Sequence, residues 1–375
     1  MSVVVVTGAL ANKPGNGGEA WVRLSWLLAL RELGVETWFL EQIDAAACGE
    51  QHVAWFERVT RRFGLAERSA LLAAGDGRVL SGPPAEALRE AAASAELLVN
   101  ISGNLTLEPL LGLPRRRAYL DLDPGYTQIW HAQGALGDAL ERHEELLTVG
   151  LAVGRESCRL PLGGRRWRPV PPPVVLAEWP LVEDEPPLAF TTVASWRGGY
   201  GRVERDGRLL GQKAHEFRRF ATLPRESGVR CEAALEIHPG DDGDARLLRD
   251  GGWRLVDPRA VAGDPDAFRA YVQRSPAELS PAQGVYVETG CGWLGDRTTR
   301  YLASGRPAVV QRTGLPPDVP LGEGLLEFST PAEACAALAA VAADYGRHAR
   351  AARRLAEERF DARRVVGTLL EDLLP

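Results

Sequence analysis

The apolar and polar positions of this chain alternate between short apolar runs, typical of buried parallel strands, and longer helical patterns. Four valines occupy residues 3–6, a loop covers 7–18, and an amphipathic helix pattern covers 19–33. A second apolar run covers 35–40, directly after Gly34. The chain therefore opens with a predicted strand, helix and parallel strand.

The same alternation covers most of the first half of the chain. Helical patterns lie at about 50–63 and 84–94, and strand patterns lie at 96–100, 117–122 and 145–149. Alternating strands and helices are typical of a doubly wound parallel sheet, whose ligands collect at the carboxyl ends of the strands. We predict one such Rossmann-like domain over residues 1–170.

Seven prolines between residues 169 and 187 predict a stiff linker, which we place at 171–187. A second alternating series follows, with strand and helix patterns at 188–195, 213–222, 233–237, 243–250 and 253–256. We therefore predict an α/β protein with a second Rossmann-like domain over 188–360.

The end of the chain, from 331 to 373, is nearly all helical in pattern, with breaks near Tyr345 and Asp361. These breaks separate a closing helix, within 361–375, from the rest of the second domain. A plain packing helix is the simplest interpretation of that segment.

Composition narrows the class of protein. The chain has 375 residues, of which 45% are hydrophobic and 25% charged, and its net charge is −6. This charge argues against general nucleic-acid binding, which favours a basic face. The sequence has no run of 18 apolar residues and no basic segment of a signal sequence, and its five scattered cysteines form no Cys-x-x-Cys pair. We expect a cytoplasmic monomer or homodimer without a membrane span.

Residues 284–314 carry the strongest candidate for a binding site. Alternating Val285 and Val287 predict a strand, glycines follow at 290, 292 and 295, and a helix is predicted over 297–304 before a new strand at 308–310. Unpaired amides at such a helix start, together with the helix dipole, favour a phosphate group. The alternative is a surface loop whose helix is capped by Asp296, since aspartate is a favoured N-cap residue.

A diphosphate at this helix start would be held by backbone amides, hydroxyls and charged donors. Lys213, which begins a predicted helix, is one of only two lysines in the chain, with Lys13. The alternative is that both lysines are solvated surface charges. The residues that we predict for the diphosphate are Gly292, Gly295, Arg297, Thr298, Thr299 and Lys213.

Two residues of the first half are candidates for a catalytic base. Asp123 follows the predicted strand 117–122, and His131 follows the same loop. A base at the carboxyl end of a strand faces the ligand edge of the sheet. The alternatives are a turn cap for Asp123 and a structural role for His131. Asp121 and Asp123 form a three-residue Asp-x-Asp match to a metal-diphosphate motif, which is weak, and we expect no metal site.

The loop 7–18 has four glycines and resembles a dinucleotide site only in part. A dinucleotide fingerprint needs a short Gly-x-Gly-x-x-Gly turn that opens directly into the helix, and this loop is much longer. Glu41, at the end of the second predicted strand, keeps a dehydrogenase open, because an acidic residue there binds a ribose.

The segment Cys291-Gly292-Trp293, followed by a helix and Ser304-Gly305-Arg306-Pro307, resembles the donor region of GT-B glycosyltransferases. Those two-domain enzymes take a sugar from a nucleoside diphosphate and carry a His-Cys-Gly-Trp signature with a downstream Ala-Gly-x-Pro. The run 322–328 and the helical tail also look like bacterial, group 1-like members. The position of the signature's histidine is Gly290 here, so the role of that histidine does not transfer.

This resemblance implies two domains that face a cleft and a last helix that crosses back to the first domain. It implies metal-independent transfer of a sugar from a nucleotide-sugar co-substrate, with no cofactor, to a small-molecule acceptor. On the acceptor side it implies a loop of Gly15, Asn16, Gly17 and Gly18. On the nucleotide and sugar side the candidates are Trp196, His238, Trp293, Gln311 and Thr313. Loop packing is the alternative for Trp196, and a structural role is the alternative for His238.

Other functions share parts of this pattern. A sugar-nucleotide epimerase or a phosphorylase of the same fold would keep the donor site, and a non-catalytic nucleotide-sugar binding protein would lack the base. The arginine-rich, lysine-poor composition is typical of a high-GC genome, in which such enzymes often modify secondary metabolites.

Overall fold

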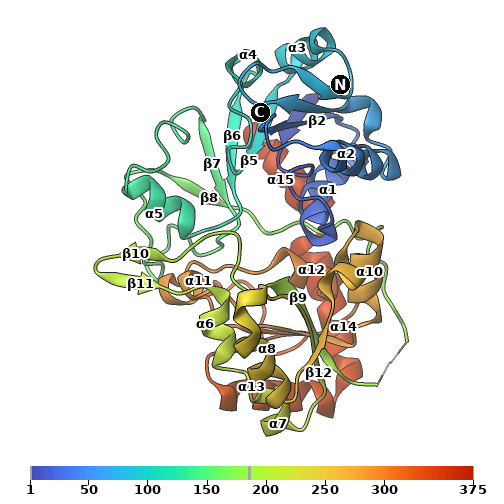
Figure 1. Cartoon of the computed structure of the whole chain (residues 1–375), viewed down its shortest axis with the longest axis vertical. Helices are drawn as coiled ribbons and strands as arrows, with labels where there is room; N and C mark the ends of the chain where they lie inside the picture. The colour runs from blue at the N-terminus through green and yellow to red at the C-terminus, as the bar shows by residue number, and fades with distance from the viewer. Residues whose placement is uncertain (1, 185–186, 375) are drawn as a thin grey trace.

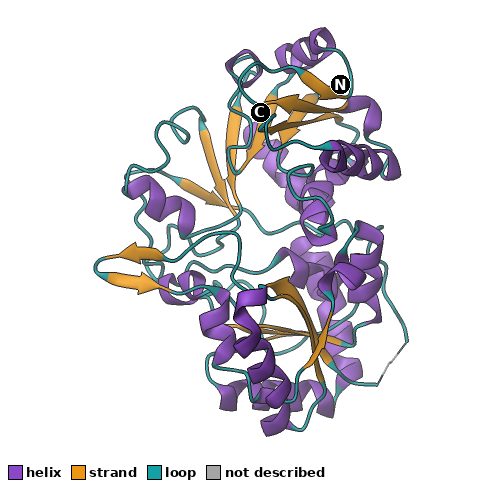
Figure 2. Cartoon of the chain, in the orientation of Figure 1, coloured by secondary structure: helices purple, strands orange, loops and turns teal. Residues whose placement is uncertain are grey.

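The computed structural model describes residues 2–184 and 187–374, which form two α/β domains (Figures 1 and 2). Each domain is built on a sheet of mainly parallel strands packed against helices, so the prediction of two Rossmann-like domains is confirmed. Residues 185–186 of the predicted linker lie outside the described residues.

The sheet of the first domain has the order β4-β3-β2-β1-β5-β6-β7-β8, with β4 antiparallel to β3 and the other neighbours parallel. The valines of β1 that lie at positions 4 to 6 are fully buried, as an apolar run between two layers of helices requires. The strands are β1 (Val3–Thr7), β2 (Glu36–Ile43), β3 (Ser69–Ala73), β4 (Val79–Ser81), β5 (Leu97–Ile101), β6 (Arg117–Asp121), β7 (Glu145–Thr148) and β8 (Trp167–Pro169). The helices are α1 (Gly17–Glu32), α2 (Glu50–Arg62), η1 (Ala66–Arg68), α3 (Ala85–Ser94), α4 (Glu108–Leu111) and α5 (Tyr126–Ala132).

The sheet of the second domain is parallel throughout, with the order β13-β12-β9-β14-β15-β16, and a separate hairpin joins β10 and β11. The strands are β9 (Phe190–Ser195), β10 (Val203–Arg205), β11 (Arg208–Leu210), β12 (Cys231–Glu236), β13 (Arg254–Val256), β14 (Ala277–Ser280), β15 (Ala308–Gln311) and β16 (Leu325–Phe328). The first helices are α6 (Lys213–Arg218), α7 (Leu223–Ser227), η2 (Pro239–Asp241), α8 (Asp242–Asp250), α9 (Pro258–Ala262), α10 (Pro265–Arg274), α11 (Gly284–Thr289) and α12 (Asp296–Ala303). The tail forms α13 (Pro331–Ala343), α14 (Tyr345–Leu355), the π-helix η3 (Ala356–Phe360) and α15 (Ala362–Leu373).

The predicted strand around Val285 and Val287 is wrong, because this segment is the helix α11. Val285 and Tyr286 are both buried, and Gly290 ends the helix in a left-handed conformation, with φ of 65°. A left-handed residue after the last turn is a common way to end a helix, and glycine adopts it without strain. The strand of this unit is β14, which lies just before α11 and places its carboxyl end towards the loop.

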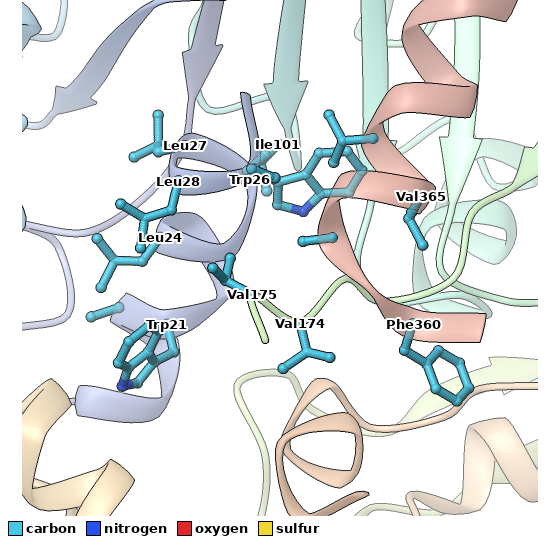
Figure 3. Close-up of a cluster of buried hydrophobic side chains, with 14 of the residues drawn as sticks. Trp21, Leu24, Trp26, Leu27, Leu28, Ile101, Val174, Val175, Phe360 and Val365 are labelled. Atoms are coloured by element: carbon cyan, nitrogen blue, oxygen red, sulfur yellow. The ribbon is translucent and has the colours of Figure 1, made fainter. Parts of the chain in front are cut away.

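The last helix, α15, lies beside α1 of the first domain (Figure 1). Figure 3 shows Val365 on α15 and Trp26 on α1 in one cluster of buried apolar side chains with the segment that carries Val174. That segment is held to the tail by backbone bonds from the Val174 amide to the Phe360 carbonyl (2.8 Å) and from the Ala362 amide to the Val174 carbonyl (2.9 Å). One apolar core therefore contains residues from both ends of the chain.

Candidate active site between the domains

The start of α12 leaves hydrogen-bonding groups free of protein partners. Gly295 is its N-cap residue and supplies no side chain, while Asp296 lies inside the helix and forms an ion pair with Arg300. The hydroxyl of Thr298 is fully buried and has no hydrogen-bond partner among the described residues. An uncapped helix start with a buried, unpaired hydroxyl can accept an anion. Thr299, by contrast, donates its hydroxyl to the carbonyl of Asp296 at 2.9 Å.

Lys213 begins α6 and is almost completely buried. Its Nζ lies 6.0 Å from the centre of the Trp293 ring, and no acidic side chain forms an ion pair with it in the part of the chain that the structure describes. Burial, together with the positive charge of the neighbouring Arg297 guanidinium, lowers the pKa of Lys213 to about 7. A buried amine without an acidic partner is costly unless a ligand brings negative charge to it.

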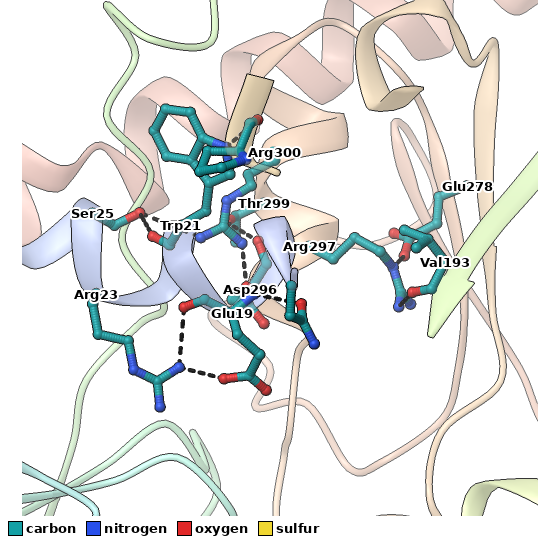
Figure 4. Close-up of polar contacts among 12 residues, drawn as sticks. Glu19, Trp21, Arg23, Ser25, Val193, Glu278, Asp296, Arg297, Thr299 and Arg300 are labelled. Carbon is teal, nitrogen blue, oxygen red and sulfur yellow. Dashed lines mark hydrogen bonds and ion pairs between the residues drawn. The ribbon is translucent and has the colours of Figure 1, made fainter. Parts of the chain in front are cut away.

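Arg297 does not have the free guanidinium that we expected at a phosphate site. Its Nε donates to Oε1 of Glu278 at 2.6 Å and its Nη2 donates to the hydroxyl of Ser280 at 2.7 Å. A third bond goes to the carbonyl of Val193, and Figure 4 shows Arg297 pointing away from Arg300 towards this carbonyl and Glu278. Arg297 therefore stabilises α12 against β9 and β14, because the buried Glu278 takes up its charge.

Gly292 also differs from the expectation. The segment that contains it pairs with the first domain, since the amides of Leu151 and Ala152 donate to the carbonyls of Gly292 (3.2 Å) and Cys291 (3.0 Å). A Cβ atom at Gly292 would lie 2.5 Å from the Ala152 amide nitrogen. Glycine is needed here for the close approach of the two domains, not for contact with a phosphate.

Three other predicted nucleotide or sugar ligands are engaged inside the second domain. Trp196 is fully buried in its core and donates Nε1 to Asp244 at 2.8 Å, so its ring has no face for a sugar or base. Gln311 is buried and accepts from the amide of Ala282 at 2.9 Å, and Thr313 donates to the carbonyl of Trp293 at 2.6 Å. These three predictions are corrected, since the polar groups of these side chains already have protein partners.

His238 lies at the surface just after β12, as its position in the sequence suggested. Its Nδ1 accepts a hydrogen bond from the amide of Gly240 at 3.1 Å, which caps the turn η2. The ring thus has a local structural role, and only its other edge remains for a ligand.

The first loop is held by Glu41. Its Oε2 accepts hydrogen bonds from the amides of Leu10 (2.8 Å) and Ala11 (2.6 Å), and its Oε1 accepts one from the amide of Asn12 (2.9 Å). Burial raises the pKa of Glu41 to about 7, in opposition to these three bonds. Both oxygens are occupied by the protein, so the acidic residue that a dinucleotide site requires is not available, and the dehydrogenase alternative is corrected.

The predicted acceptor loop divides into two parts. Gly15 is exposed and Asn16 caps α1 by accepting from the amide of Glu19 at 3.1 Å. Gly17 and Gly18, however, pack against the second domain, because a Cβ atom would lie 2.0 Å from the Asp264 carbonyl oxygen and 3.2 Å from the Phe268 ring, respectively. We correct the expectation for Gly17 and Gly18, which lie in a domain contact.

Asp123 lies just beyond β6 and receives two phenol groups from the second domain. The hydroxyl of Tyr286, on α11, donates to Oδ1 at 3.1 Å, and the hydroxyl of Tyr200 donates to Oδ2 at 3.3 Å. Burial raises the pKa of Asp123 to about 6, and the negative charges of Asp121 and Glu19 also raise it. A carboxylate with such a pKa takes up a proton readily near neutral pH.

Asp121 has a different environment from Asp123. It accepts hydrogen bonds from the hydroxyls of Thr127 (2.6 Å) and Thr148 (2.8 Å) and from the amide of Gln128 (2.9 Å), and it is almost fully buried. This aspartate joins β6, β7 and α5, which leaves Asp123 as the carboxylate that faces the other domain.

His131 is not brought near Asp123. It lies in the last turn of α5, and a Cβ atom on Gly163 would lie 3.1 Å from its ring. The structure thus separates the two candidates for a base and favours the aspartate.

An aromatic pair connects Asp123 with the start of α12. The rings of Tyr286 and Trp293 are stacked, with centroids 4.7 Å apart and an interplanar angle of 26°. Trp293 is half-buried and also borders Lys213. Tyr286 was not among the predicted site residues, because the pattern around it predicted a strand, whose alternation gave no sign that this tyrosine faces the other domain.

Within the described residues, no helix has the length and apolar character needed to cross a membrane. The same residues contain no group of three or more histidine, cysteine, aspartate or glutamate side chains arranged to hold a metal ion.

No family model and no curated protein sequence matches this chain. Its structure is similar to that of an α-glucosyltransferase (AGT) in complex with UDP, at 11% identity and a TM-score of 0.59 over 100% of both chains. Sucrose-phosphate synthase from Thermosynechococcus elongatus gives 13% identity and a TM-score of 0.56, over 100% of this chain and 99% of that one. Anabaena Alr3699/HepE in complex with UDP gives 12% identity and a TM-score of 0.57, over 100% of this chain and 99% of that one. The α-glucosyltransferase is also known in complex with UDP and a 13-mer DNA. At these identities the similarity shows a shared fold.

Proposed function

We propose that this chain, which has the GT-B fold of the glycosyltransferases, transfers a sugar from a nucleoside diphosphate sugar to a small-molecule acceptor. The observation that carries the proposal is Lys213, a buried amine that forms no ion pair with the acidic residues that the structure describes and that borders Trp293 near the uncapped start of α12. A diphosphate would supply the missing negative charge and bond to the free helix amides and to Thr298.

In this proposal the two sides of the site have separate tasks. Lys213, the first amides of α12 and Thr298 stabilise the charge that develops on the leaving diphosphate. Asp123 accepts the proton of the acceptor hydroxyl. Trp293 and Tyr286 lie between these groups, so that donor and acceptor would meet at this aromatic pair.

The nature of the acceptor is a finer part of the proposal. UDP is the first nucleotide to test, since it occurs in the similar structures named above. One of those proteins has been seen with DNA, whereas the net charge of −6 argues against nucleic acid as the acceptor here and leaves a small molecule as our proposal. We extend the proposal to secondary metabolites on composition alone, and a hexose is the simplest sugar to assume.

Nucleotide binding to the intact protein tests the proposal directly. A thermal-shift panel would contain UDP, GDP, dTDP, ADP, NAD and a short DNA duplex. A ligand at about 100 times its Kd stabilises the folded protein by about 2.7 kcal/mol. We expect a response to one nucleoside diphosphate that Lys213→Met abolishes. Lys13→Met is the matched control, because it removes the only other lysine, which is exposed and paired with Glu19 at 3.1 Å.

Amine labelling provides a second measurement. With only two lysines in the chain, pyridoxal phosphate followed by borohydride can mark two side chains, and the bound nucleotide should protect Lys213 alone. Failure of every diphosphate to stabilise the protein, or equal stabilisation of Lys213→Met, would overturn the proposal. Stabilisation by NAD alone would favour an oxidoreductase.

A further inference from the structure

We propose that Tyr286 is a positioning residue, which holds and polarises the base Asp123 from the opposite domain; this inference rests on the proposed function. The role would complete the base only when the two domains are in the contact that the structure shows. Tyr286 belongs to α11 of the second domain and Asp123 to the end of β6 in the first.

A chain of hydrogen bonds fixes the direction of the Tyr286 hydroxyl. Tyr126 donates its hydroxyl to Oε1 of Gln283 at 2.9 Å, which leaves the amide end of Gln283 to donate to the Tyr286 oxygen at 3.3 Å. The Tyr286 proton then points to Oδ1 of Asp123, at 3.1 Å between the oxygens. Because the amide of Gln283 can donate and its carbonyl only accepts, this order cannot be reversed without losing a bond.

Tyr286 is suited to orient the base and not to exchange protons itself. Its side chain is only 2% exposed, and burial raises its pKa well above the ordinary value, so the phenol stays protonated. The hydrogen bond to Asp123 favours the ionised carboxylate and therefore opposes the effect of burial on that group. The same hydrogen bond occupies Oδ1 of Asp123. Oδ2, which accepts the longer bond from Tyr200, is therefore the oxygen that takes up a proton.

The proton balance of the step is simple. The acceptor O–H proton moves to Oδ2 of Asp123, the acceptor oxygen forms a bond to the anomeric carbon, and the bond from that carbon to the phosphate oxygen breaks. The electron pair of the broken bond leaves with the diphosphate, next to Lys213 and α12.

Tyr286 also connects the two halves of the site. Its ring stacks on Trp293, and the Trp293 ring borders Lys213.

The titration of Asp123 depends on every charged or titratable group that faces it. Among the described residues these are Asp121 and Tyr119 on β6, Tyr126 on α5, Glu19 on α1, Lys13 in the first loop, Tyr200 before β10 and Tyr286 on α11. Of the two phenols that donate a hydrogen bond to Asp123, Tyr286 is the more deeply buried and makes the shorter bond. Loss of the Tyr286 hydroxyl should therefore change the pKa of Asp123 more than the loss of a hydroxyl that forms no bond with that carboxylate.

The experiment follows the carboxyl carbon of Asp123 by NMR in full-length protein labelled with [4-13C]aspartate, and Asp123→Asn identifies the signal. Tyr286→Phe keeps the ring and its stacking on Trp293 but removes the hydroxyl. We expect the pKa of Asp123 to rise by about one pH unit in this variant. Tyr119→Phe is the matched control, because Tyr119 is also buried in the same apolar cluster and, among the described residues, no hydrogen bond joins it to Asp123, Gln283 or Tyr286, so no such rise is expected.

An unchanged Asp123 titration in folded Tyr286→Phe, as judged by circular dichroism, would overturn the inference. An equal rise in Tyr119→Phe would overturn it as well, since it would indicate a general loosening of the aromatic cluster. Both titrations are measured without nucleotide, so their outcome does not depend on the proposed function. Failure of the proposed function would instead appear as the absence of stabilisation by any nucleoside diphosphate. With a donor that is turned over, the acid limb of the rate profile should shift with the same pKa, and kcat should fall roughly tenfold at unchanged donor KM.

Discussion

The guanidinium of Arg297 and the carboxylate of Glu278 form an ion pair inside the second domain, with 2.6 Å between Nε and Oε1. Glu278 is fully buried on β14, and Arg297 is in the first turn of α12, so the pair fixes the helix start against the sheet. A phosphate site at this helix start thus depends on Arg297 indirectly, because Arg297 positions the helix by binding Glu278 and does not itself bind the phosphate.

Breaking this pair should strongly destabilise the protein. Glu278→Gln leaves the buried guanidinium without a counter-charge, and we expect the free energy of unfolding to fall by about 3–5 kcal/mol, as measured by urea denaturation. Glu323→Gln is the control, since Glu323 forms an exposed ion pair with Arg347 and should change little. Similar losses in the two variants would mean that the buried pair is not the anchor of α12.

Lys213→Met should stabilise the unliganded protein while it removes nucleotide binding. Burial lowers the pKa of Lys213 to about 7 from an ordinary value of 10.5, so the folded state holds its proton less firmly than the unfolded state does. The wild type therefore loses stability as the pH falls from 10.5 to 7, and the full penalty remains below pH 7. We expect methionine to gain roughly 1–3 kcal/mol near pH 7 and progressively less at pH 9 and above, from unfolding curves at several pH values. A variant that is less stable than the wild type at pH 7 would contradict this account.

The sequence predicted most of the architecture, because strands such as 3–6 are continuous apolar runs between helical patterns. It failed at β14 for a physical reason. This strand contains Glu278, and a charged residue in a short apolar run predicts a loop. The run can be recognised as a buried strand only when the distant partner of Glu278, Arg297, is known. The segment 285–287 failed because two valines two residues apart fit a strand and a single helical turn equally well.

The candidate site was harder to predict than the fold. Glycines in a loop indicate close approach, but the sequence does not tell whether the neighbour is a ligand or, as at Gly17 and Gly292, the other domain. Polar residues at strand ends, such as Gln311, form hydrogen bonds with residues distant in the sequence, and only the structure shows these partners. Lys213 was predictable because lysine is rare in this chain, and Asp123 because it follows the end of a predicted strand. Their connection through Tyr286 and Trp293 was not predictable.

Asp123→Asn should separate the stability of the site from its function. The pKa of Asp123 is raised from 3.8 to about 6 in the folded state, so the wild type loses stability as the pH rises from about 4 to 6. The asparagine variant lacks this loss, and its advantage over the wild type should appear in that window and stay constant above pH 6. Its rate of sugar transfer should fall by about 10²–10⁴ if the carboxylate is the base. Full activity in a folded Asp123→Asn protein would exclude this carboxylate as the base.

The contact between the segments at 151–152 and 291–293 makes a final prediction about how the domains are held together. Gly292→Ala places a methyl group 2.5 Å from the Ala152 amide nitrogen, whereas Gly154→Ala meets nothing within 4 Å. Both glycines have positive φ, of 71° and 88°, so both variants pay a similar backbone strain and their difference isolates the domain contact. We expect Gly292→Ala to be less stable than Gly154→Ala by about 1–3 kcal/mol in chemical denaturation, and to weaken nucleotide stabilisation because Trp293 is displaced with the segment. Equal stability of the two variants would mean that the segment moves aside without cost, and that the contact of Tyr286 with Asp123 is not held by this bridge.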